Sequence, residues 1–200
     1  VIANVYGPDA EGVTLAFRFK GIENKIPVKK DNQVIGNIPS LDPYYIKMLS
    51  MLLTNGQAGL IDLNLNQQQK VLGAYAYDMA FNDYSVFAMG AKPRQGQKLE
   101  DVTKLLLSQL DSIKLGKFDN WLIDAVINDY KTSKMQEYES NKSRADAFVN
   151  AFISHKNWNE YLMEIDILKD IKKESIMKFV AENFKDNYVV IYKRKGVDTT

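Results

Sequence analysis

The residue types that most often carry catalysis are sparse in this 200-residue chain, which has one histidine, His155, and no cysteine. A catalytic zinc ion normally takes three protein ligands drawn mainly from His, Cys, Asp and Glu, so this composition argues against a zinc site built by the chain alone. The same counts exclude a cysteine nucleophile and a thiol redox motif, and the only Ser-His-Asp triad they permit is one centred on His155. We therefore expect no catalytic residue, no metal ligand and no cofactor in this chain.

The acidic residues form no pair suited to general acid–base catalysis. Glu137 and Glu139 lie two positions apart on a predicted helix, so their side chains point in different directions. Asp78 and Asp83 flank a predicted hairpin turn, where an Asp side chain usually bonds its own backbone, and no calcium-loop spacing surrounds them. We expect these carboxylates to be solvated or to stabilise turns.

Aromatic and apolar residues alternate on two predicted neighbouring strands, at Tyr75, Tyr77, Phe87 and Met89. These side chains would either line a groove for a peptide or pack beneath helices. Packing in the core is the favoured interpretation, because apolar cross-strand pairs are the usual way in which sheets are held together.

The first half of the chain predicts the strands and helices that would position these residues. Residues 13–20 alternate apolar and polar side chains, which indicates a strand with one buried face. Residues 21–41 carry Pro27, Pro39, Gly36 and scattered charges, and predict an irregular or hairpin-like excursion. Further elements are a helix from Asp42 to Asn55-Gly56, a short helix over 57–65, and antiparallel strands over 71–79 and 85–93.

The second half of the chain is predicted to be helical. Apolar residues recur there at spacings of three and four, which is typical of amphipathic helices. The helices are expected over 99–113, from Asp119, beyond Ser140, over 158–165 and over 176–184, before a closing strand over 188–192. The order of elements predicts an α+β fold, in which long helices lie on one face of a mainly antiparallel sheet.

Composition narrows the possible partners. The formal net charge is +1, which gives no electrostatic reason to expect binding to nucleic acid or to an anionic membrane. The apolar stretches are shorter than the roughly 20 residues needed to cross a bilayer.

The chain is long enough for one domain, so we expect residues 1–200 to form a single α+β unit. Because the chain starts without Met or a signal pattern, we expect it to be a segment of a larger precursor.

Several segments occur in a familiar order. They are residues 59–65, 71–76, 89–93, 99–102, 115–122, 140–145, 168–176 and 183–192. Together they resemble the pitrilysin/insulinase family of zinc metallopeptidases, whose chains contain repeated α+β units of this size, some catalytic and some not. The resemblance runs from Leu15 to Gly196. It implies the metallohydrolase-like fold of the LuxS and mitochondrial-processing-peptidase type.

The residues that would make such a unit catalytic are missing. Catalytic units carry H-x-x-E-H on a helix, where two imidazoles share one face and the Glu is the base for zinc-bound water, and no such motif is present. His155 is expected to end a helix and bond free carbonyl groups. Non-catalytic units can offer an Arg and a Tyr seven positions apart to substrate, but Asn66 and Gly73 stand at those positions.

A shift of two positions in that alignment would place Tyr75 in the second position and Gln68 in the first. Tyr75 is therefore the one candidate substrate contact. The resemblance implies a non-catalytic unit that forms part of the chamber of a zinc endopeptidase, contacts sister domains and unfolded peptide, and leaves zinc to a sister domain. The alternative is a non-peptidase scaffold unit of the same fold, as in respiratory-complex core proteins. An extracytoplasmic location, such as the periplasm, is slightly favoured over the cytoplasm.

Overall fold

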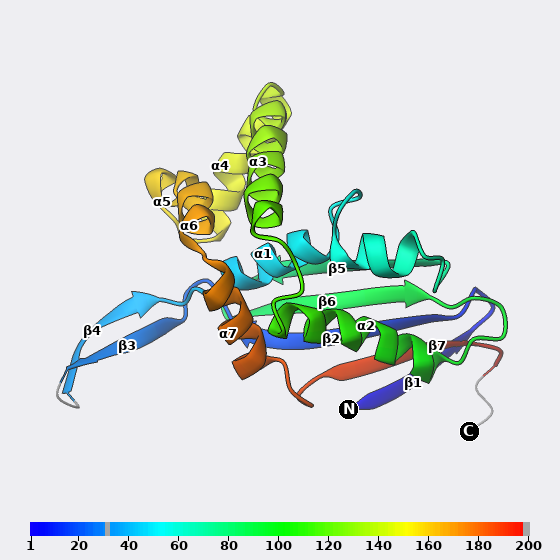
Figure 1. Cartoon of the computed structure of the whole chain (residues 1–200). Helices are drawn as coiled ribbons and strands as arrows, with labels where there is room; N and C mark the ends of the chain where they lie inside the picture. The colour runs from blue at the N-terminus through cyan, green and yellow to red at the C-terminus, as the bar shows by residue number, and fades with distance from the viewer. Residues whose placement is uncertain (31–32, 198–200) are drawn as a thin grey trace.

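The computed structural model describes residues 1–30 and 33–197, and side chains are described outside residues 27–38. Its centre is a five-stranded sheet with the strand order β1-β7-β2-β6-β5 (Figure 1). These strands are β1 (Ile2–Gly7), β2 (Gly12–Lys20), β5 (Gly73–Ala80), β6 (Tyr84–Lys92) and β7 (Val189–Lys195). The predicted α+β fold is confirmed.

The alternating strand predicted over residues 13–20 is the middle of the sheet. Val13, Leu15, Phe17 and Phe19 of β2 are buried, whereas the residues between them are more exposed. Antiparallel partners flank β2 on both sides, β6 on one and β7 on the other. The period of two therefore gives this strand one buried face, as predicted.

The sheet is mixed, because β1 pairs with β7 in the parallel direction. The sequence does not predict β1, since its residues are exposed on both faces and show no alternation. Arg194 reaches across from β7 and donates from Nε to the Oδ1 of Asn4 at 2.7 Å. Tertiary pairing, rather than a local pattern, makes this segment a strand.

The excursion predicted over residues 21–41 is a hairpin. Strands β3 (Lys25–Lys30) and β4 (Gln33–Pro39) pair antiparallel as a separate two-stranded sheet, which projects from the body (Figure 1). Residues 31 and 32 of the predicted excursion lie outside the described residues. The hairpin-like alternative is therefore correct for the described strands.

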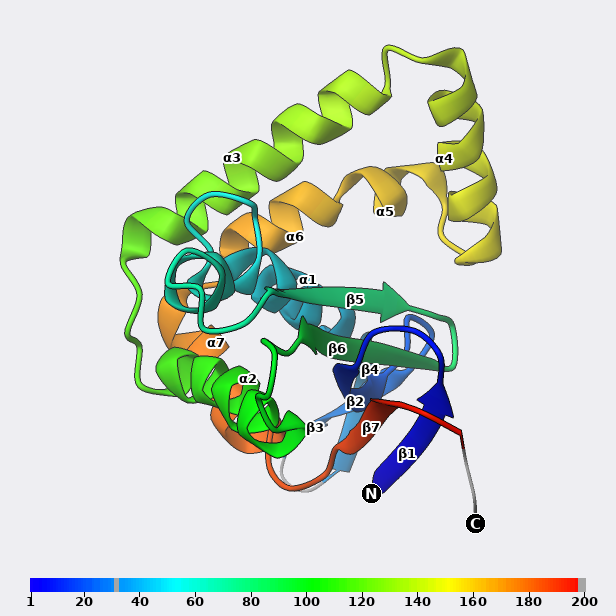
Figure 2. The ribbon, with the colours of Figure 1, turned by 90° about the vertical axis from the view of Figure 1, so that its right-hand side faces the viewer.

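Three helices cover one face of the sheet, namely α1 (Asp42–Leu53), α2 (Leu99–Lys114) and α7 (Lys173–Asn183). Figure 2 shows them on the same side of the strands. Their apolar faces and the buried face of the sheet form one core, in which Phe184 contacts the rings of Phe17 and Phe87. The short helix predicted over 57–65 is a π-helical turn, η1 (Asp62–Asn66), beside β5.

The remaining helices do not lie on the sheet. They are α3 (Asn120–Glu137), α4 (Asn141–Ile153), α5 (Trp158–Leu162) and α6 (Glu164–Asp170), and they rise above it as one group, here called the arm (Figure 1). Helices α3 and α6 contact α1, whereas α4 and α5 contact their neighbours in the chain. The predicted layer of long helices on one face is present as α1, α2 and α7, and the arm is an addition to it that the sequence did not place, because helical periodicity does not specify which partner an apolar stripe meets.

Candidate functional site: the open face of the sheet

The face of the sheet opposite to α1, α2 and α7 is not covered by these helices, and its apolar and small side chains are bordered by basic residues at the strand ends, namely Arg18, Lys20, Lys92, Lys193 and Lys195. Residues of this open face alternate with the buried residues on each strand and are adjacent in the strand registers. They are Val5, Thr14, Ala16, Tyr75, Tyr77, Met79, Val86, Ala88, Val189 and Ile191. An extended apolar sheet face of this kind is typical of a surface that meets another polypeptide.

Tyr75, the predicted substrate contact, lies on this open face with 48% of its surface exposed. Its ring stacks beside that of Tyr77 at a centroid distance of 6.0 Å and covers Gly90 of the neighbouring strand. No other observation on this chain tests a role in substrate binding, so that role stays a prediction. The ring lies between Tyr77 and the backbone of Gly90.

The four alternating residues of the hairpin do not share one face. Phe87 and Met89 are fully buried in the core, as favoured by the sequence, whereas Tyr75 and Tyr77 lie on the open face. The register explains the difference, since Tyr75 is opposite Gly90 and Ala76 is opposite Met89. Because cross-strand partners point to the same side of a sheet, an odd-numbered residue of β5 and an odd-numbered residue of β6 point to opposite sides.

The outer edge of β5 is already partly occupied by side chains. The amide of Asn66, from η1, accepts from the N–H of Ala74 at 2.8 Å and donates to its carbonyl oxygen at 2.9 Å. The hydroxyl of Thr54 accepts from the N–H of Ala76 at 2.9 Å. A peptide adding to this edge as a strand therefore has access to the second half of β5 only.

Asn66 thus has a structural task at the position where an Arg was expected in related non-catalytic units. An amide that bonds both the N–H and the C=O of one residue makes the two hydrogen bonds that a neighbouring strand would otherwise make. Gly73, the second of those positions, is the first residue of β5 and has open space where a side chain would be. Neither residue offers a charge or a hydroxyl to a substrate.

A charged cluster at the base of the arm joins α1, α3 and α6. Nζ of Lys47 lies 3.1 Å from Oε1 of Glu164, and the hydroxyl of Tyr130 donates to Oε2 of Glu164 at 3.1 Å. Burial alone would raise the pKa of Glu164, but Lys47 and Tyr130 outweigh burial, so the pKa of this carboxyl lies below its usual range. The cluster fastens the base of the arm to α1.

Burial also acts on the other two members of this cluster. It would lower the pKa of Lys47, but the charge of Glu164 reverses that effect and holds the pKa above its usual range. Burial raises the pKa of the Tyr130 hydroxyl. All three groups therefore keep their ordinary charge at neutral pH, which is the behaviour of a structural cluster and not of a general acid or base.

His155 follows the end of α4, as the sequence predicts, but its side-chain partner is different. Its ring nitrogen Nδ1 pairs with a carboxylate oxygen of Glu23, at the turn before the hairpin, and not with a free carbonyl. Its own φ of +51° is left-handed, so His155 ends the helix in the conformation in which Gly or Asn is usual. The imidazole thus fastens the arm to the turn before the hairpin.

Two of the candidate carboxylates, those of Asp78 and Glu137, also have structural partners. Asp78 accepts from the hydroxyl of Ser50 at 2.6 Å, and Glu137 pairs with Lys134 at 2.8 Å. Across residues 1–30 and 33–197, the structure contains no group of three His, Cys, Asp or Glu side chains that could hold a metal ion. In the same part of the chain, no helix is both long and apolar enough to cross a bilayer.

The sequence model of the family described as the peptidase M16 inactive domain matches residues 12–130. This match confirms the predicted resemblance to a non-catalytic unit, and the description of the family as inactive agrees with a chain that is not an enzyme by itself. No curated protein matches the sequence.

Solved structures share the fold at low sequence identity. A protease from Helicobacter pylori has a TM-score of 0.80 at 19% identity, over 96% of this chain and 44% of that one. An inactive peptidase domain from Bordetella parapertussis has a TM-score of 0.75 at 13% identity, over 97% of each chain. A chain of Complex III from Candida albicans has a TM-score of 0.69 at 11% identity, over 96% of this chain and 45% of that one. The chain thus spans less than half of the Helicobacter protein and nearly all of the Bordetella domain.

Proposed function

Because this chain belongs to the family of peptidase M16 inactive domains, we propose that it is a non-catalytic unit in the wall of a larger zinc endopeptidase. In this proposal residues 1–200 are one domain of that protein, zinc is held by a sister domain, and the chamber between the domains encloses unfolded peptides. The observation that carries the proposal is the match to an inactive domain over more than half of the chain, including the whole of β2, β5 and β6.

The open face of the sheet is the surface that we assign to the chamber. Its centre is apolar, the described helices α1, α2 and α7 cover the other face, and Tyr75 and Tyr77 give it two broad rings with hydroxyl groups. Tyrosine rings offer large contact area at low cost in conformational entropy, which suits a surface that meets many peptide sequences. The second half of β5 adds backbone groups to which an extended peptide can bind.

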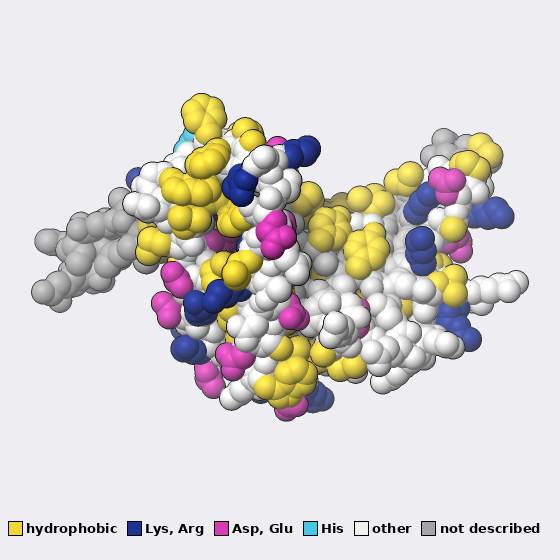
Figure 3. Space-filling model, turned by 90° about the horizontal axis from the view of Figure 1, so that it is seen from above, with side chains coloured by type: hydrophobic (Ala, Val, Ile, Leu, Met, Phe, Trp, Pro, Cys, Tyr) yellow, Lys and Arg dark blue, Asp and Glu magenta, His cyan; other side chains and the backbone are white. Residues whose placement is uncertain are grey.

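The arm is the surface that we assign to a sister domain. Seen from above, hydrophobic side chains gather over it (Figure 3). Those with more than 40% of their surface exposed include Met135, Phe148, Val149, Phe152 and Ile153. An apolar patch of this kind is rare on a protein without a partner, and the Helicobacter protein of the same fold is long enough to hold further domains.

The alternative is a scaffold unit without proteolysis. The specific observation in its favour is the shared fold with Complex III from Candida albicans. The sequence of the parent protein discriminates between the two functions, because only the peptidase requires H-x-x-E-H in a sister domain. The same sequence would show whether a secretion signal accompanies the extracytoplasmic location that we favour.

Reconstitution tests the proposal. The 200-residue chain and the sister domain are purified separately and together, and zinc content and cleavage of a fluorogenic unfolded peptide are measured. We expect no stoichiometric zinc and no cleavage with this chain alone, and faster cleavage by the pair than by the sister alone. Tyr75→Ala should raise KM of the pair more than it lowers kcat. Zinc and cleavage that stay with this chain through repurification would overturn the proposal.

A further inference from the structure

A groove of about 810 Å³ separates the arm from the base of the hairpin. Its walls come from the turn before β3, the start of α1, the turn between α4 and α5, and helix α6. This volume lies within the roughly 300–1,000 Å³ that is usual for ligand sites. The groove uses none of the residues assigned to the open face.

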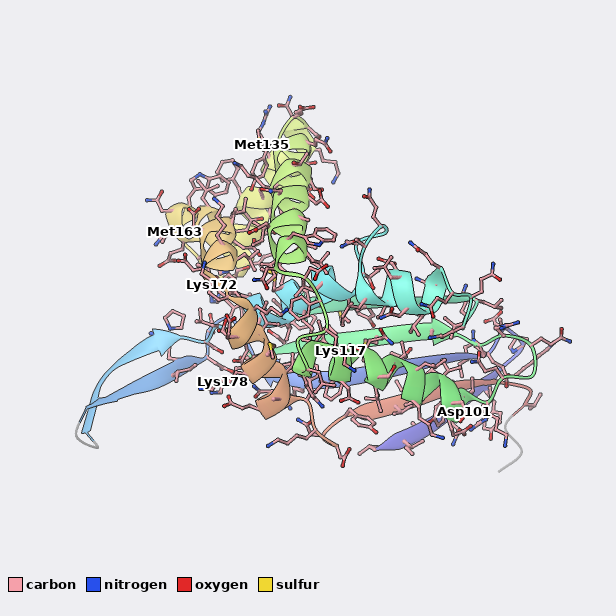
Figure 4. All side chains as sticks on the ribbon, in the orientation of Figure 1. Asp101, Lys117, Met135, Met163, Lys172 and Lys178 are labelled. Carbon is pink, nitrogen blue, oxygen red and sulfur yellow. The ribbon has the colours of Figure 1, made fainter. Side chains whose placement is uncertain are left out.

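The walls of the groove are mainly apolar. Leu41, just before α1, and Met163, between α5 and α6, both line the groove, and each has more than 40% of its surface exposed. Met163 is labelled in Figure 4, where it lies on the side of the arm that overlooks the hairpin. Two exposed apolar side chains facing one groove favour a ligand with an apolar group between them.

Lys156 supplies a fixed positive charge in the same groove. Its Nζ donates to the hydroxyl of Tyr44 at 3.2 Å and lies 5.2 Å from the centre of that ring, so the side chain is held against the wall. Among the described residues, no carboxylate lies within ion-pair distance of this ammonium group. Within residues 1–30 and 33–197, the hydroxyl of Tyr44 is the hydrogen-bond acceptor found for this ammonium group, which has three donors.

The carboxylates around Lys156 already have partners. Glu160 accepts from the backbone N–H of Asn157 at 3.0 Å as part of a helix cap, and Glu23 pairs with His155. Glu164, whose pKa Lys156 also helps to lower, is bound to Lys47 and Tyr130. The positive charge of Lys156 is therefore not neutralised by a direct contact, and it is complementary to an acidic group.

We propose that this groove is a binding site for a peptide segment that carries an apolar side chain next to a carboxylate. The apolar side chain lies between Leu41 and Met163, and the carboxylate accepts hydrogen bonds from Lys156. This site rests on the proposed function as a unit that contacts peptides, and it adds a preference for acidic, apolar sequences away from the open face. The pair of His155 and Glu23 joins the two walls and keeps the groove in shape.

Fluorescence polarisation with labelled peptides tests this site on the 200-residue chain. The probe is an eight-residue peptide in which Leu and Glu alternate, and the control peptides replace every Glu by Gln or every Leu by Ser. Lys156→Glu and Met163→Asp are compared with Lys178→Glu and Met135→Asp, whose positions on α7 and at the far end of α3 are labelled in Figure 4. Circular dichroism establishes that each variant is folded.

We expect the Leu and Glu peptide to bind at least about tenfold more tightly than either control peptide, since one charge-assisted contact is worth that much. Lys156→Glu and Met163→Asp should remove this preference, and the two control variants should keep it.

Equal binding of the Glu and Gln peptides would overturn the site. Binding that is lost in Tyr75→Ala but unchanged in the groove variants would overturn it too, while leaving the proposed function intact. No binding at all would also overturn the site. The proposed role in the chamber wall would still be tested separately by the reconstitution assay.

Discussion

The ring of Tyr75 lies against Gly90 on the neighbouring strand, so closely that a Cβ at position 90 would be 2.5 Å from the ring carbon Cζ. The two residues face each other in the register of β5 and β6. Since Gly90 has no side chain, the ring can lie flat across the strand pair and extend the open face. The position of the proposed substrate contact therefore depends on a glycine in another strand.

Gly90→Ala should displace the ring of Tyr75 without unfolding the protein. The clashing atoms are the far end of a half-exposed side chain that can swing away, so the free energy of unfolding should fall by no more than about 1 kcal/mol. Peptide affinity of the open face should fall as far as in Tyr75→Ala. Urea unfolding and the KM of the reconstituted enzyme measure the two effects.

The double variant Gly90→Ala/Tyr75→Ala is the control for this prediction. If both single changes act through one ring, their effects on KM are not additive, and the double variant resembles Tyr75→Ala alone. Additive effects would show that Gly90 acts independently of Tyr75.

Asn66→Ala should loosen the start of β5. Removing the amide leaves the N–H and the carbonyl of Ala74 without their partners, which should cost about 1–3 kcal/mol of unfolding free energy. Hydrogen exchange at the Ala74 amide should become faster. Gln67→Ala is the matched control, because its exposed amide bonds a single carbonyl in a loop and its loss should change little. Equal exchange rates at Ala74 in Asn66→Ala and the unaltered chain would contradict this account.

Lys47→Met should destabilise the protein through the carboxylate that it leaves behind. The side chains of Lys47 and Glu164 keep only 26% and 20% of their surface exposed, so we expect a loss of about 2 kcal/mol, less than for fully buried pairs. The double variant Lys47→Met/Glu164→Leu should recover part of this loss. Lys142→Met, at the exposed pair of Lys142 and Asp146, is the control and should show no resolvable change in urea unfolding.

The same cluster should give the stability a defined dependence on pH. The pKa of Glu164 is lower in the folded protein than its ordinary value, so its contribution is complete above about pH 4.3 and is lost as the pH falls through the folded pKa. The pKa of Lys47 is raised, so its contribution persists up to about pH 10. The difference in unfolding free energy between the unaltered chain and Glu164→Gln should be constant between these limits and shrink in acid.

His155→Gly should leave stability within about 1 kcal/mol of the unaltered chain. Glycine relieves the left-handed backbone at this position, which offsets the loss of the exposed pair with Glu23. His155→Val keeps the backbone strain, loses the pair and should be less stable than His155→Gly in urea unfolding. A zinc content that differed among these variants would contradict the structural role of His155.

Local patterns predict much of this molecule. The alternation in residues 13–20 gave the buried strand, and the positions of Asp42, Pro43 and Gly116 set helix boundaries within one or two residues. The helix predicted over 158–165 is divided at Met163 into α5 and α6, because contacts with α1 and α3 decide where the second helix lies. Periodicity specifies an apolar face but not the partner that covers it.

By itself, the sequence determined that this is an α+β chain with too few histidines and no cysteines for a zinc site of its own, since ligand chemistry depends on residue types. Only the tertiary structure decided that β1 joins the sheet in parallel and that Tyr75 and Tyr77 lie on the other face of the sheet from Phe87 and Met89. It also decided that Lys156 lies in a groove with Met163. These facts depend on strand register and on contacts between residues far apart in the chain, and no local pattern contains them.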